Sequence, residues 1–500
     1  MENRHEIQAA EQLLRQEGLL AAPSGATVSF TGLSNNSQET AAGDLFICKG
    51  YGFKPSYLQM AAERGAVCYL SEEAVAGARI PFLRVTDVRK AQSVLARWFY
   101  GVPSSGFVLT GITGTKGKTT TAFDLQAILS AYTGRPTGLI STVERFVGDE
   151  HQPSHLTTPE SLDLQQLFAR ARDNGLPYVT MEVSSQAYKV DRVYGQYFDF
   201  GIFLNFGEDH VSPREHPTVE DYLACKLRLM ENCGTAVICR EAACFDRIYA
   251  TAVQHAQKVC LVGIEQNDCD YIARNVSKET FGFSFQVQEK DSAETFTYHL
   301  PQEGRFNVEN ALTAIAVGRE LGIPHAVMAL ALERLQVPGR MNMITGGGLR
   351  VLVDYVHNRL SFQAVFDSLK KDYPGAPLYV VAGAPGERAE ARRDDIGSLC
   401  GANAARAIFT SDDPGFDDPA AICQRMSRAA AQSGGARVDI VIDRTQAVEQ
   451  IIREAPDGAV VILAGKGHEV TQRVRGQYEP YESDAVVARR ALAAREAAQK

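Results

Sequence analysis

The chain has 500 residues, too many for one hydrophobic core, since single cores stop growing at about 250–300 residues. Its 51 basic and 60 acidic residues give a net charge of −9, which excludes a general electrostatic attraction to nucleic acid or anionic lipid. No apolar run reaches the length of about 18 residues that a membrane helix needs. The ten cysteines are scattered without a C-x-x-C pair, which favours reduced thiols and a cytoplasmic protein.

The first segment, residues 1–102, carries short apolar runs such as Gly43–Cys48 and Ala66–Leu70. These runs predict a small α/β domain. The glycine- and proline-containing stretch Gly101–Gly106 predicts a linker after it.

From Phe107 the pattern changes to strand, loop, helix and strand. Phe107–Ile112 predicts a strand and Thr119–Tyr132 a helix, and further strands are expected at Tyr178–Val183, Phe200–Asn205 and Thr235–Cys239. Apolar runs separated by helices predict a parallel sheet covered on both faces. In Asp270–Leu300 apolar and polar residues alternate, which predicts an antiparallel ribbon. We expect this central domain to span 103–337.

A second joint is expected at Val337–Arg340, and a third domain spans 338–500. Its predicted strands are Leu349–Asp354, Leu378–Ala384, Ala407–Thr410, Asp439–Ile442 and Val460–Ala464, followed by a helix at Asp484–Ala498. Strands separated by helices again indicate a doubly wound, Rossmann-like sheet. The predicted fold class is therefore α/β with three domains.

Gly111–Thr121 follows an apolar strand and opens a helix, as a phosphate-binding loop does. The strict pattern G-x-x-x-x-G-K-[ST] would need glycine where this chain has Ile112, so the loop is a variant. Backbone donors at a helix N-terminus favour phosphate, Lys118 would reach the β- and γ-phosphates, and Thr119 would ligate Mg²⁺. The predicted nucleotide-binding residues are Gly114, Thr115, Lys116, Gly117, Lys118, Thr119 and Thr120. The alternative is an ordinary glycine-rich turn.

Glu182 lies near the carboxyl end of a predicted strand, where ligands of open α/β sheets bind. A carboxylate there suits Mg²⁺, although an acid paired with an arginine is the alternative. His210 follows the next strand and Lys226 lies on the helix after it. By themselves these two are equally consistent with structural roles.

Together these segments resemble the Mur ligase family of peptidoglycan synthesis over nearly the whole chain, in particular the branch that adds the third residue of the stem peptide. The matching blocks are Thr113–Thr120, Thr157–Pro159, Met181–Ser185, Asp209-His210, Tyr222–Lys226, Gly304–Ala311, Pro338–Met341, Asp354–Asn358 and Gly465–Glu469. Many blocks in the family's order are far more specific than any one of them.

The resemblance implies three domains that bind a UDP-sugar, ATP and an amino acid. It implies an ATP-dependent, ADP-forming acid–amino-acid ligase that extends UDP-N-acetylmuramoyl-L-alanyl-D-glutamate through an acyl phosphate. A monomer is expected. Glu182 and His210 would hold Mg²⁺ with Thr119 and a carbamylated Lys226, and together with Lys118 they would form the catalytic set. Asn307, Arg340 and Asp354 would contact ATP. The UDP-muramoyl-dipeptide would contact Ser37, Thr157, Thr158, Ser184 and Arg192, and the amino acid would contact Arg388, Asp412, Asp413, Gly465 and Glu469.

Four positions depart from the family pattern. Lys116 replaces asparagine in the loop, and Gln38 replaces the arginine of Asp-Ser-Arg near the uridine site, so that one cation is lost. Gln186 replaces a histidine, and Arg359 stands where proline often follows His-Asn. These departures allow a diverged ligase with another acceptor.

The acceptor amino acid is predicted from Asp412–Gly415. The diaminopimelate-adding branch has Asp-Asn-Pro-Arg there, and exchanging its arginine for an added carboxylate, Asp413, favours L-lysine. Gly465, Glu469 and Arg388 look like the diaminopimelate branch, so both amino acids remain open. Alternatives to this function are a folylpolyglutamate synthetase-like ligase and a non-catalytic ATP-binding module.

Overall fold

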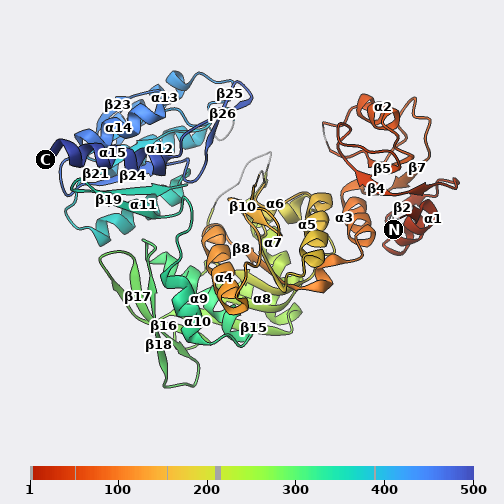
Figure 1. Ribbon diagram of the computed structural model, residues 1–500, viewed down its shortest axis with the longest axis horizontal. Coiled ribbons are helices and arrows are strands. Elements are labelled where there is room, and N and C mark those ends of the chain that lie inside the picture. The colour runs from red at the N-terminus through yellow and green to blue at the C-terminus, as the bar shows by residue number, and fades with distance from the viewer. Residues whose placement is uncertain (1–3, 51, 155, 209–214, 388–389, 500) are drawn as a thin grey trace. The chain divides into compact units, whose positions relative to one another are not determined.

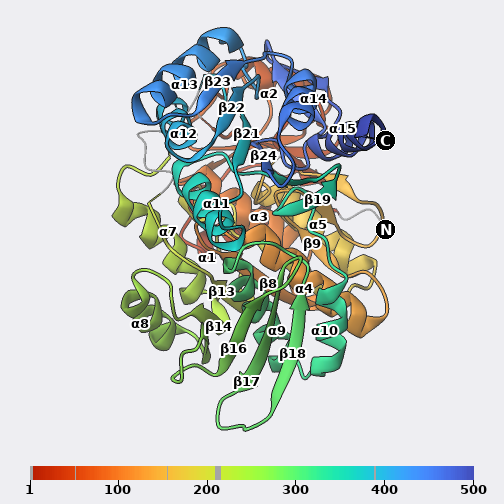
Figure 2. The same ribbon diagram turned by 90° about the vertical axis from the view of Figure 1, so that its left-hand side faces the viewer.

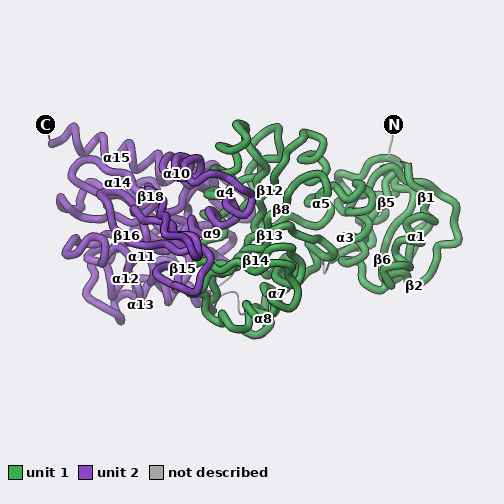
Figure 3. The backbone as a smooth tube through the Cα atoms, turned by 90° about the horizontal axis from the view of Figure 1, so that it is seen from below, with its two compact units in different colours: residues 1–262 green, residues 263–500 purple. Residues whose placement is uncertain are grey.

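The computed structural model describes residues 4–50, 52–154, 156–208, 215–387 and 390–499. The chain forms two compact units, residues 1–262 and 263–500 (Figure 3). His210 and Arg388, both predicted site residues, lie outside the described residues. No helix within the described ranges is long and apolar enough to cross a membrane.

The first unit begins with a five-stranded sheet in the order β2-β7-β6-β5-β4. Its strands are β2 Leu20–Ala22, β4 Gly32–Ser34, β5 Asp44–Ile47, β6 Cys68–Ser71 and β7 Phe82–Val85, beside the short pair β1 His5–Glu6 and β3 Ser29–Phe30. Helices α1 Ile7–Gln16 and α3 Val88–Phe99 contribute to the core that contains Leu45 and Ile47, whereas α2 Pro55–Glu63 contributes to the core that contains Phe46. Both faces of β5 are therefore covered, as its fully apolar centre requires.

A second sheet occupies the rest of this unit, and its strands here follow the order β11-β10-β9-β12-β8-β13-β14-β15. Strands β8, β10 and β15 are labelled in Figure 1. Its strands are β8 Val108–Thr113, β9 Gly138–Ile140, β10 Glu144–Phe146, β11 Gln152–Pro153, β12 Tyr178–Glu182, β13 Phe198–Phe203, β14 Cys233–Cys239 and β15 Lys258–Ile264. Neighbouring strands in β9-β12-β8-β13-β14-β15 are parallel, which confirms the predicted sheet. Strands β10 and β11 add an antiparallel edge beside β9. Its helices are α4 Lys118–Thr133, α5 Ser161–Asp173, α6 Ser185–Lys189, α7 Val219–Glu231 and α8 Phe245–His255.

Strand β8 lies at the centre of this sheet, between β12 and β13. Gly111 pairs with Met181 on one side and with Gly201 on the other. A Cβ at Gly111 would lie 2.7 Å from the Phe198 ring, so only glycine allows this close packing. The carboxyl ends of three neighbouring strands thus meet at the loop that follows β8.

The predicted linker after residue 102 is a structured turn. Pro103–Gly106 forms a short 3₁₀ helix, and Val102 before it has a left-handed backbone with φ 50°. The turn signals in Gly101–Gly106 were interpreted correctly as a break between elements. The break is ordered because Gln196 donates a hydrogen bond to Ser104 at 3.0 Å.

In the second unit the predicted antiparallel ribbon is confirmed. It consists of β16 Tyr271–Lys278, β17 Phe283–Glu289 and β18 Thr295–Leu300, and it is followed by α9 Phe306–Glu320 and α10 His325–Glu333. Phe283, Phe285 and Val287 are buried, as their alternation predicts.

A six-stranded sheet in the order β19-β20-β24-β21-β22-β23 fills the remainder of this unit. Its elements are β19 Asn342–Gly346, β20 Leu349–Asp354, α11 Arg359–Asp372, β21 Leu378–Ala382, α12 Ala391–Asn403, β22 Arg406–Phe409, α13 Pro419–Ser433, β23 Arg437–Ile440, α14 Arg444–Glu454, β24 Val460–Ala464, the hairpin β25 Thr471–Val474 and β26 Gln477–Pro480, and α15 Asp484–Gln499. Figure 2 shows α12 and α13 on one side of the strands and α14 and α15 on the other. The Rossmann-like prediction is confirmed, with β23 beginning two residues earlier than expected.

A buried ion pair joins α14 to α15. Arg444 donates to both carboxylate oxygens of Asp484, at 2.9 and 2.7 Å, and both side chains are 0% exposed. Replacing Asp484 with alanine leaves a buried guanidinium without its counter-charge, so we expect a loss of about 3–5 kcal/mol in the free energy of unfolding of this region. Urea denaturation followed by far-UV circular dichroism measures it. The matched control is Arg490→Ala on the same helix, whose exposed pairs with Glu449 and Glu482 should contribute little.

The ten cysteines form no disulfide bond within the described residues. Nine are buried and Cys244 is exposed. Burial raises the pKa of Cys48, Cys68, Cys233 and Cys423 to about 12, so these thiols stay protonated at neutral pH.

Candidate nucleotide and ligation site

The loop after β8 has the backbone of a phosphate-binding loop. Gly114 has φ 154° and Gly117 has φ 86°, and Gly117 is the residue before helix α4. A Cβ at Gly114 would lie 3.0 Å from Leu204 Cβ and 3.2 Å from the Lys116 carbonyl. Both glycines are therefore required by the turn, which leads into the N-terminus of α4, the end of a helix that favours an anion. Lys118 Nζ donates to the carbonyl of Gly114 at 2.8 Å.

Asn205, two residues after β13, holds this loop in place. Its side-chain oxygen accepts from Lys116 N at 2.9 Å, its side-chain amide donates to Lys116 O at 3.1 Å, and its carbonyl accepts from Thr115 N at 3.1 Å. Asn205 was predicted as the last residue of this strand, with no role in the site. The contacts use the main chain of Lys116, so the asparagine-to-lysine departure leaves them possible.

Glu182, at the end of β12, is 1% exposed and faces the same loop. Its carboxylate accepts from Thr119 Oγ1 at 2.9 Å, from Thr142 N at 2.7 Å and from Thr142 Oγ1 at 3.1 Å. Among the described residues these donors are all uncharged. Hydrogen bonds from neutral donors leave the burial of a carboxylate costly, and a bound cation would offset that cost. Glu182 and Thr119 thus fit a hard cation with oxygen ligands.

Lys226, on helix α7, lies on the other side of the loop. Thr218 caps the helix by accepting from Asp221 N, which sets the position of the residues that follow. Lys226 is 1% exposed, donates to the Gly114 carbonyl at 2.8 Å and lies 4.6 Å from the centre of the Tyr222 ring. Its ammonium and that of Lys118 therefore share one backbone acceptor.

The predicted dipeptide-binding residues form a connected group. Thr158 Oγ1 donates to the Glu182 carbonyl at 2.9 Å and lies 3.3 Å from Ser184 Oγ. Thr157 Oγ1 accepts from Thr142 Oγ1 at 3.1 Å, and Arg192 donates to the Thr158 carbonyl at 3.2 Å. These four predicted residues are brought together beside Glu182.

A buried histidine of this unit was missed by sequence reasoning. His216 binds Asp221 Oδ2 at 2.6 Å through Nδ1 and Ser185 Oγ at 2.9 Å through Nε2. Ligand atoms of His216, Asp221 and Cys225 lie within 4.8 Å of one another. Asp221 is also paired with Lys189 at 2.6 Å, so these side chains already satisfy one another and we interpret the group as a brace between α6 and α7.

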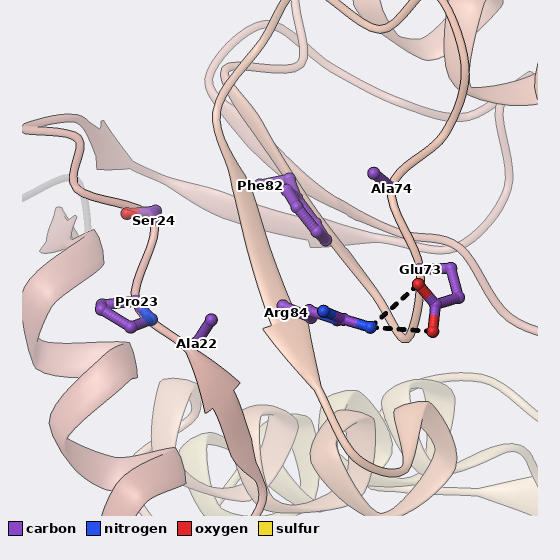
Figure 4. A pocket seen from close by; sticks show the side chains of 7 residues that line it. All are labelled: Ala22, Pro23, Ser24, Glu73, Ala74, Phe82 and Arg84. Carbon is purple, nitrogen blue, oxygen red and sulfur yellow. Dashed lines mark hydrogen bonds and ion pairs between the residues drawn. The ribbon is translucent and has the colours of Figure 1, made fainter.

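Two cavities lie in the N-terminal sheet. One, of about 320 Å³, is lined by Asn36, Ser37, Gln38 and Lys49, so the predicted uridine-site residue Ser37 borders a real cavity. The other, of about 310 Å³, is shown in Figure 4. There Arg84 is paired with both oxygens of Glu73 at 2.9 Å, which neutralises its charge.

The second unit contains three residues predicted to contact ATP. Asn307 is 2% exposed, donates to the Glu303 carbonyl at 2.6 Å and accepts from Asn310 at 2.8 Å. Arg340 lies 4.7 Å from the centre of the Tyr355 ring, and Asp354 accepts from Met341 N at 2.6 Å. Asp354 and Arg340 belong to neighbouring segments, whereas Asn307 lies at the start of α9.

A carboxylate cluster lies after β22 and β24. Lys466, which is 1% exposed, donates to Asp413 at 2.9 Å and is paired with Glu469. Asp412 packs so closely on Gly465 that a Cβ there would lie 2.2 Å from Asp412 Oδ2. Burial, opposed by the nearby charges of Lys466 and Arg444, raises the pKa of Asp412 to about 6. Burial opposes the charge on Lys466, but the surrounding carboxylates outweigh it and raise its pKa.

This arrangement joins four of the predicted amino-acid residues and adds one that was missed. Lys466 stands between two residues that the sequence analysis named, Gly465 and Glu469, and a lysine between two glycines was the available signal. Arg359, another departure, is the first residue of α11, a position that tolerates proline, and it forms an exposed pair with Asp395 at 3.2 Å.

Comparison with known proteins agrees with the fold. The Mur ligase middle domain matches residues 112–318, and the Mur ligase glutamate ligase domain matches residues 339–467. The chain belongs to the Mur ligase family, whose members are ATP-dependent, ADP-forming ligases.

Individual relatives match over nearly their full length. The chain is 38% identical to a UDP-N-acetylmuramyl-tripeptide synthetase of Latilactobacillus sakei subsp. sakei, over 97% of this chain and 98% of that protein. It is 38% identical to a UDP-N-acetylmuramoyl-L-alanyl-D-glutamate–L-lysine ligase of Enterococcus faecalis, over 92% and 91% of the two chains. A solved structure of a UDP-N-acetylmuramoyl-L-alanyl-D-glutamate–2,6-diaminopimelate ligase superposes with a TM-score of 0.66 at 25% identity, over 93% and 95%.

Proposed function

We propose that this ligase adds L-lysine to UDP-N-acetylmuramoyl-L-alanyl-D-glutamate, with conversion of ATP to ADP and phosphate. The observation that carries the proposal is the pairing of a phosphate-binding loop with the buried, neutrally bonded carboxylate of Glu182. The resemblance to a tripeptide synthetase and to an L-lysine ligase over more than nine-tenths of the chain supports the substrates. The folylpolyglutamate-like alternative is disfavoured because the match to these relatives includes the N-terminal segment.

The chemistry follows from the positions of the side chains. A carboxylate of the muramoyl-dipeptide attacks the γ-phosphate, ADP leaves, and the incoming amine then displaces phosphate from the acyl phosphate to form the amide. Lys118 and the N–H groups at the start of α4 would stabilise negative charge on the transferred phosphoryl group. Thr157, Thr158, Ser184 and Arg192 would orient the dipeptide.

Mg²⁺, when bound, would offset the charge of the phosphates and of the attacking carboxylate. Glu182 and Thr119 would hold it with His210. We propose that Lys226 joins them as a carbamate: its neutral amine adds to carbon dioxide, loses a proton and becomes an anion. The ammonium of Lys226 lies on the same loop carbonyl as that of Lys118, so modification would also relieve repulsion between two cations.

The preference for L-lysine is supported by the carboxylate cluster of the second unit. Among the described residues, Asp412, Asp413 and Glu469 supply three carboxylates. The cations that act on Asp412 are Lys466 and Arg444, and Arg444 is already paired with Asp484. The surplus negative charge favours a distal ammonium, whereas the distal carboxylate of diaminopimelate would add a further negative charge.

The test is a competition between L-lysine and meso-diaminopimelate in an ADP-release assay with the muramoyl-dipeptide. We expect kcat/KM to favour L-lysine by at least about 100-fold, because a misplaced charge is strongly rejected. Preferential use of diaminopimelate would contradict the lysine assignment. ADP release that requires neither amino acid would contradict the ligase itself.

The binding of L-lysine should depend on pH through Asp412. Its pKa of about 6 means that the carboxyl loses its charge as the pH falls below that value, while the ammonium of lysine stays charged. We expect the KM for L-lysine to rise about tenfold between pH 7 and pH 5. Asp412→Asn should abolish this pH dependence, and the KM for ATP measured in parallel serves as the control.

A further inference from the structure

Three charged side chains from separate segments of the first unit meet beside the larger of the two similar cavities, the one that Ser37 borders. Lys49 lines this cavity, and its ammonium lies 2.5 Å from Glu160 Oε2. The other oxygen, Glu160 Oε1, accepts from Arg192 at 2.9 Å. The side chains are 17%, 27% and 16% exposed, so this Lys49–Glu160–Arg192 triad is largely shielded from water.

The triad carries more positive than negative charge. Although burial opposes ionisation of Glu160, Lys49 and Arg192 outweigh it and hold its pKa below the usual range. Burial raises the pKa of a further carboxyl group, Asp163, and the charges of Lys49 and Arg145 oppose this shift. One carboxylate therefore orients two cations without cancelling both, and an anion at the cavity meets an excess of positive charge.

The loop that carries Glu160 is joined to the cavity by a second, uncharged route. Asn35, another residue that lines the cavity, donates to Gln92 at 3.4 Å, and Gln92 donates to Ser161 at 2.6 Å. Ser161 and Glu160 are adjacent, so two successive residues are linked to cavity-lining side chains: Glu160 directly to Lys49, and Ser161 through Gln92 to Asn35.

The same loop reaches the predicted dipeptide site. Arg192, held by Glu160, donates to the Thr158 carbonyl at 3.2 Å, and Thr158 contacts Ser184 at 3.3 Å. Glu160 thus lies between a cation at the cavity and the residues expected to orient the reacting carboxylate.

We propose that Lys49 binds the diphosphate of the nucleotide-sugar substrate and that Glu160 is a positioning residue that links Lys49 to Arg192 and Thr158. This inference rests on the proposed function. Lys49 would supply the cation that Gln38 does not, because Gln38 stands beside Ser37 where an arginine is expected. A substrate that occupies both the cavity beside Lys49 and the predicted dipeptide site would then be held by one connected set of side chains.

The direct test measures the binding of UDP and of uridine by calorimetry, without ATP or amino acid. In the unchanged chain we expect UDP to bind more tightly than uridine. Lys49→Gln should weaken UDP at least about tenfold and leave uridine unchanged, because only the diphosphate needs the cation, and Lys49→Arg should retain most of the affinity. The control is Arg84→Gln in the cavity of Figure 4, where the cation is already neutralised by Glu73.

The coupling is tested with Glu160→Gln in the full ligation assay. The KM for the muramoyl-dipeptide should rise about tenfold, while the KM for ATP stays unchanged, since a general loss of structure would change both. Thermal unfolding of each variant confirms that it is folded. Should Lys49→Gln fail to fold, the comparison of UDP with uridine in Lys49→Arg and Glu160→Gln decides.

The outcomes separate this inference from the proposed function. Equal affinities for UDP and uridine in the unchanged chain, or an unaltered UDP affinity in Lys49→Gln, overturn the inference while ligation of L-lysine can still proceed. Lys49-dependent UDP binding without any ligation of the dipeptide overturns the proposed function and leaves the inference standing.

Discussion

Replacing Lys226 with alanine is expected to lower kcat by at least about 100-fold, because the anion proposed there would no longer balance the charge at the reacting phosphoryl group. Lys226 is 1% exposed and donates to the Gly114 carbonyl of the phosphate loop. Removing its side chain therefore changes the site itself and leaves the protein surface unaltered. ADP release with saturating substrates measures kcat. Added acetate or formate should restore part of it by supplying a carboxylate in the vacated space.

Lys226→Arg is the matched variant, since arginine keeps the cation and cannot form a carbamate. We expect it to be as inactive as alanine and not to be restored by carboxylates. Full activity of Lys226→Arg would show that the positive charge is what the site needs. An unchanged kcat in Lys226→Ala, with normal ATP binding, would instead favour a module that binds ATP without catalysis.

Glu182→Gln should reduce kcat/KM for ATP by about 100-fold and increase the Mg²⁺ concentration needed for half-maximal activity. The amide oxygen of glutamine can still accept from Thr119 Oγ1 and Thr142 N, so the packing is retained and the charge alone is lost. A magnesium titration of ADP release makes the measurement. Glu11→Gln is the control, because Glu11 is a buried glutamate of the same unit that accepts from Ser24 N and Oγ. An unaltered magnesium requirement in Glu182→Gln would exclude Glu182 as a metal ligand.

The phosphate loop could be predicted from sequence because its determinants are local. Gly114, Gly117 and Lys118 lie within a few residues of one another, between a strand and a helix that apolar periodicity identifies. Glu182 could be predicted for a related reason, since the carboxyl end of a buried strand is a place where ligands bind.

The residues that complete the site could not be predicted, because they come from distant segments. Asn205 is 89 residues from Lys116, and Thr142 is 40 residues from Glu182. They meet because β9 lies beside β12 and β13 lies beside β8. Apolar periodicity identifies strands but does not say which strands are neighbours.

The sequence identified an added carboxylate in the predicted amino-acid site but not the side chains that it contacts. The added carboxylate of Asp413 was interpreted as favouring L-lysine, but its contact with Lys466 spans 53 residues and was not foreseen. Strand β23 was placed two residues late because it is only half-buried, and Asp439, at its centre, pairs with Arg406 at 2.8 Å. His210 and Arg388 lie outside the described residues, so their roles remain predictions.

The distribution of thiols makes the unaltered chain suitable for site-specific labelling. Cys244, at the start of α8, is exposed, whereas the other nine cysteines are shielded, and burial raises the pKa of several of them to about 12. A maleimide or spin-label reagent at neutral pH should therefore attach at a single position, without prior removal of native cysteines. A second cysteine introduced beyond residue 263 would then allow a distance between the two units to be measured during turnover.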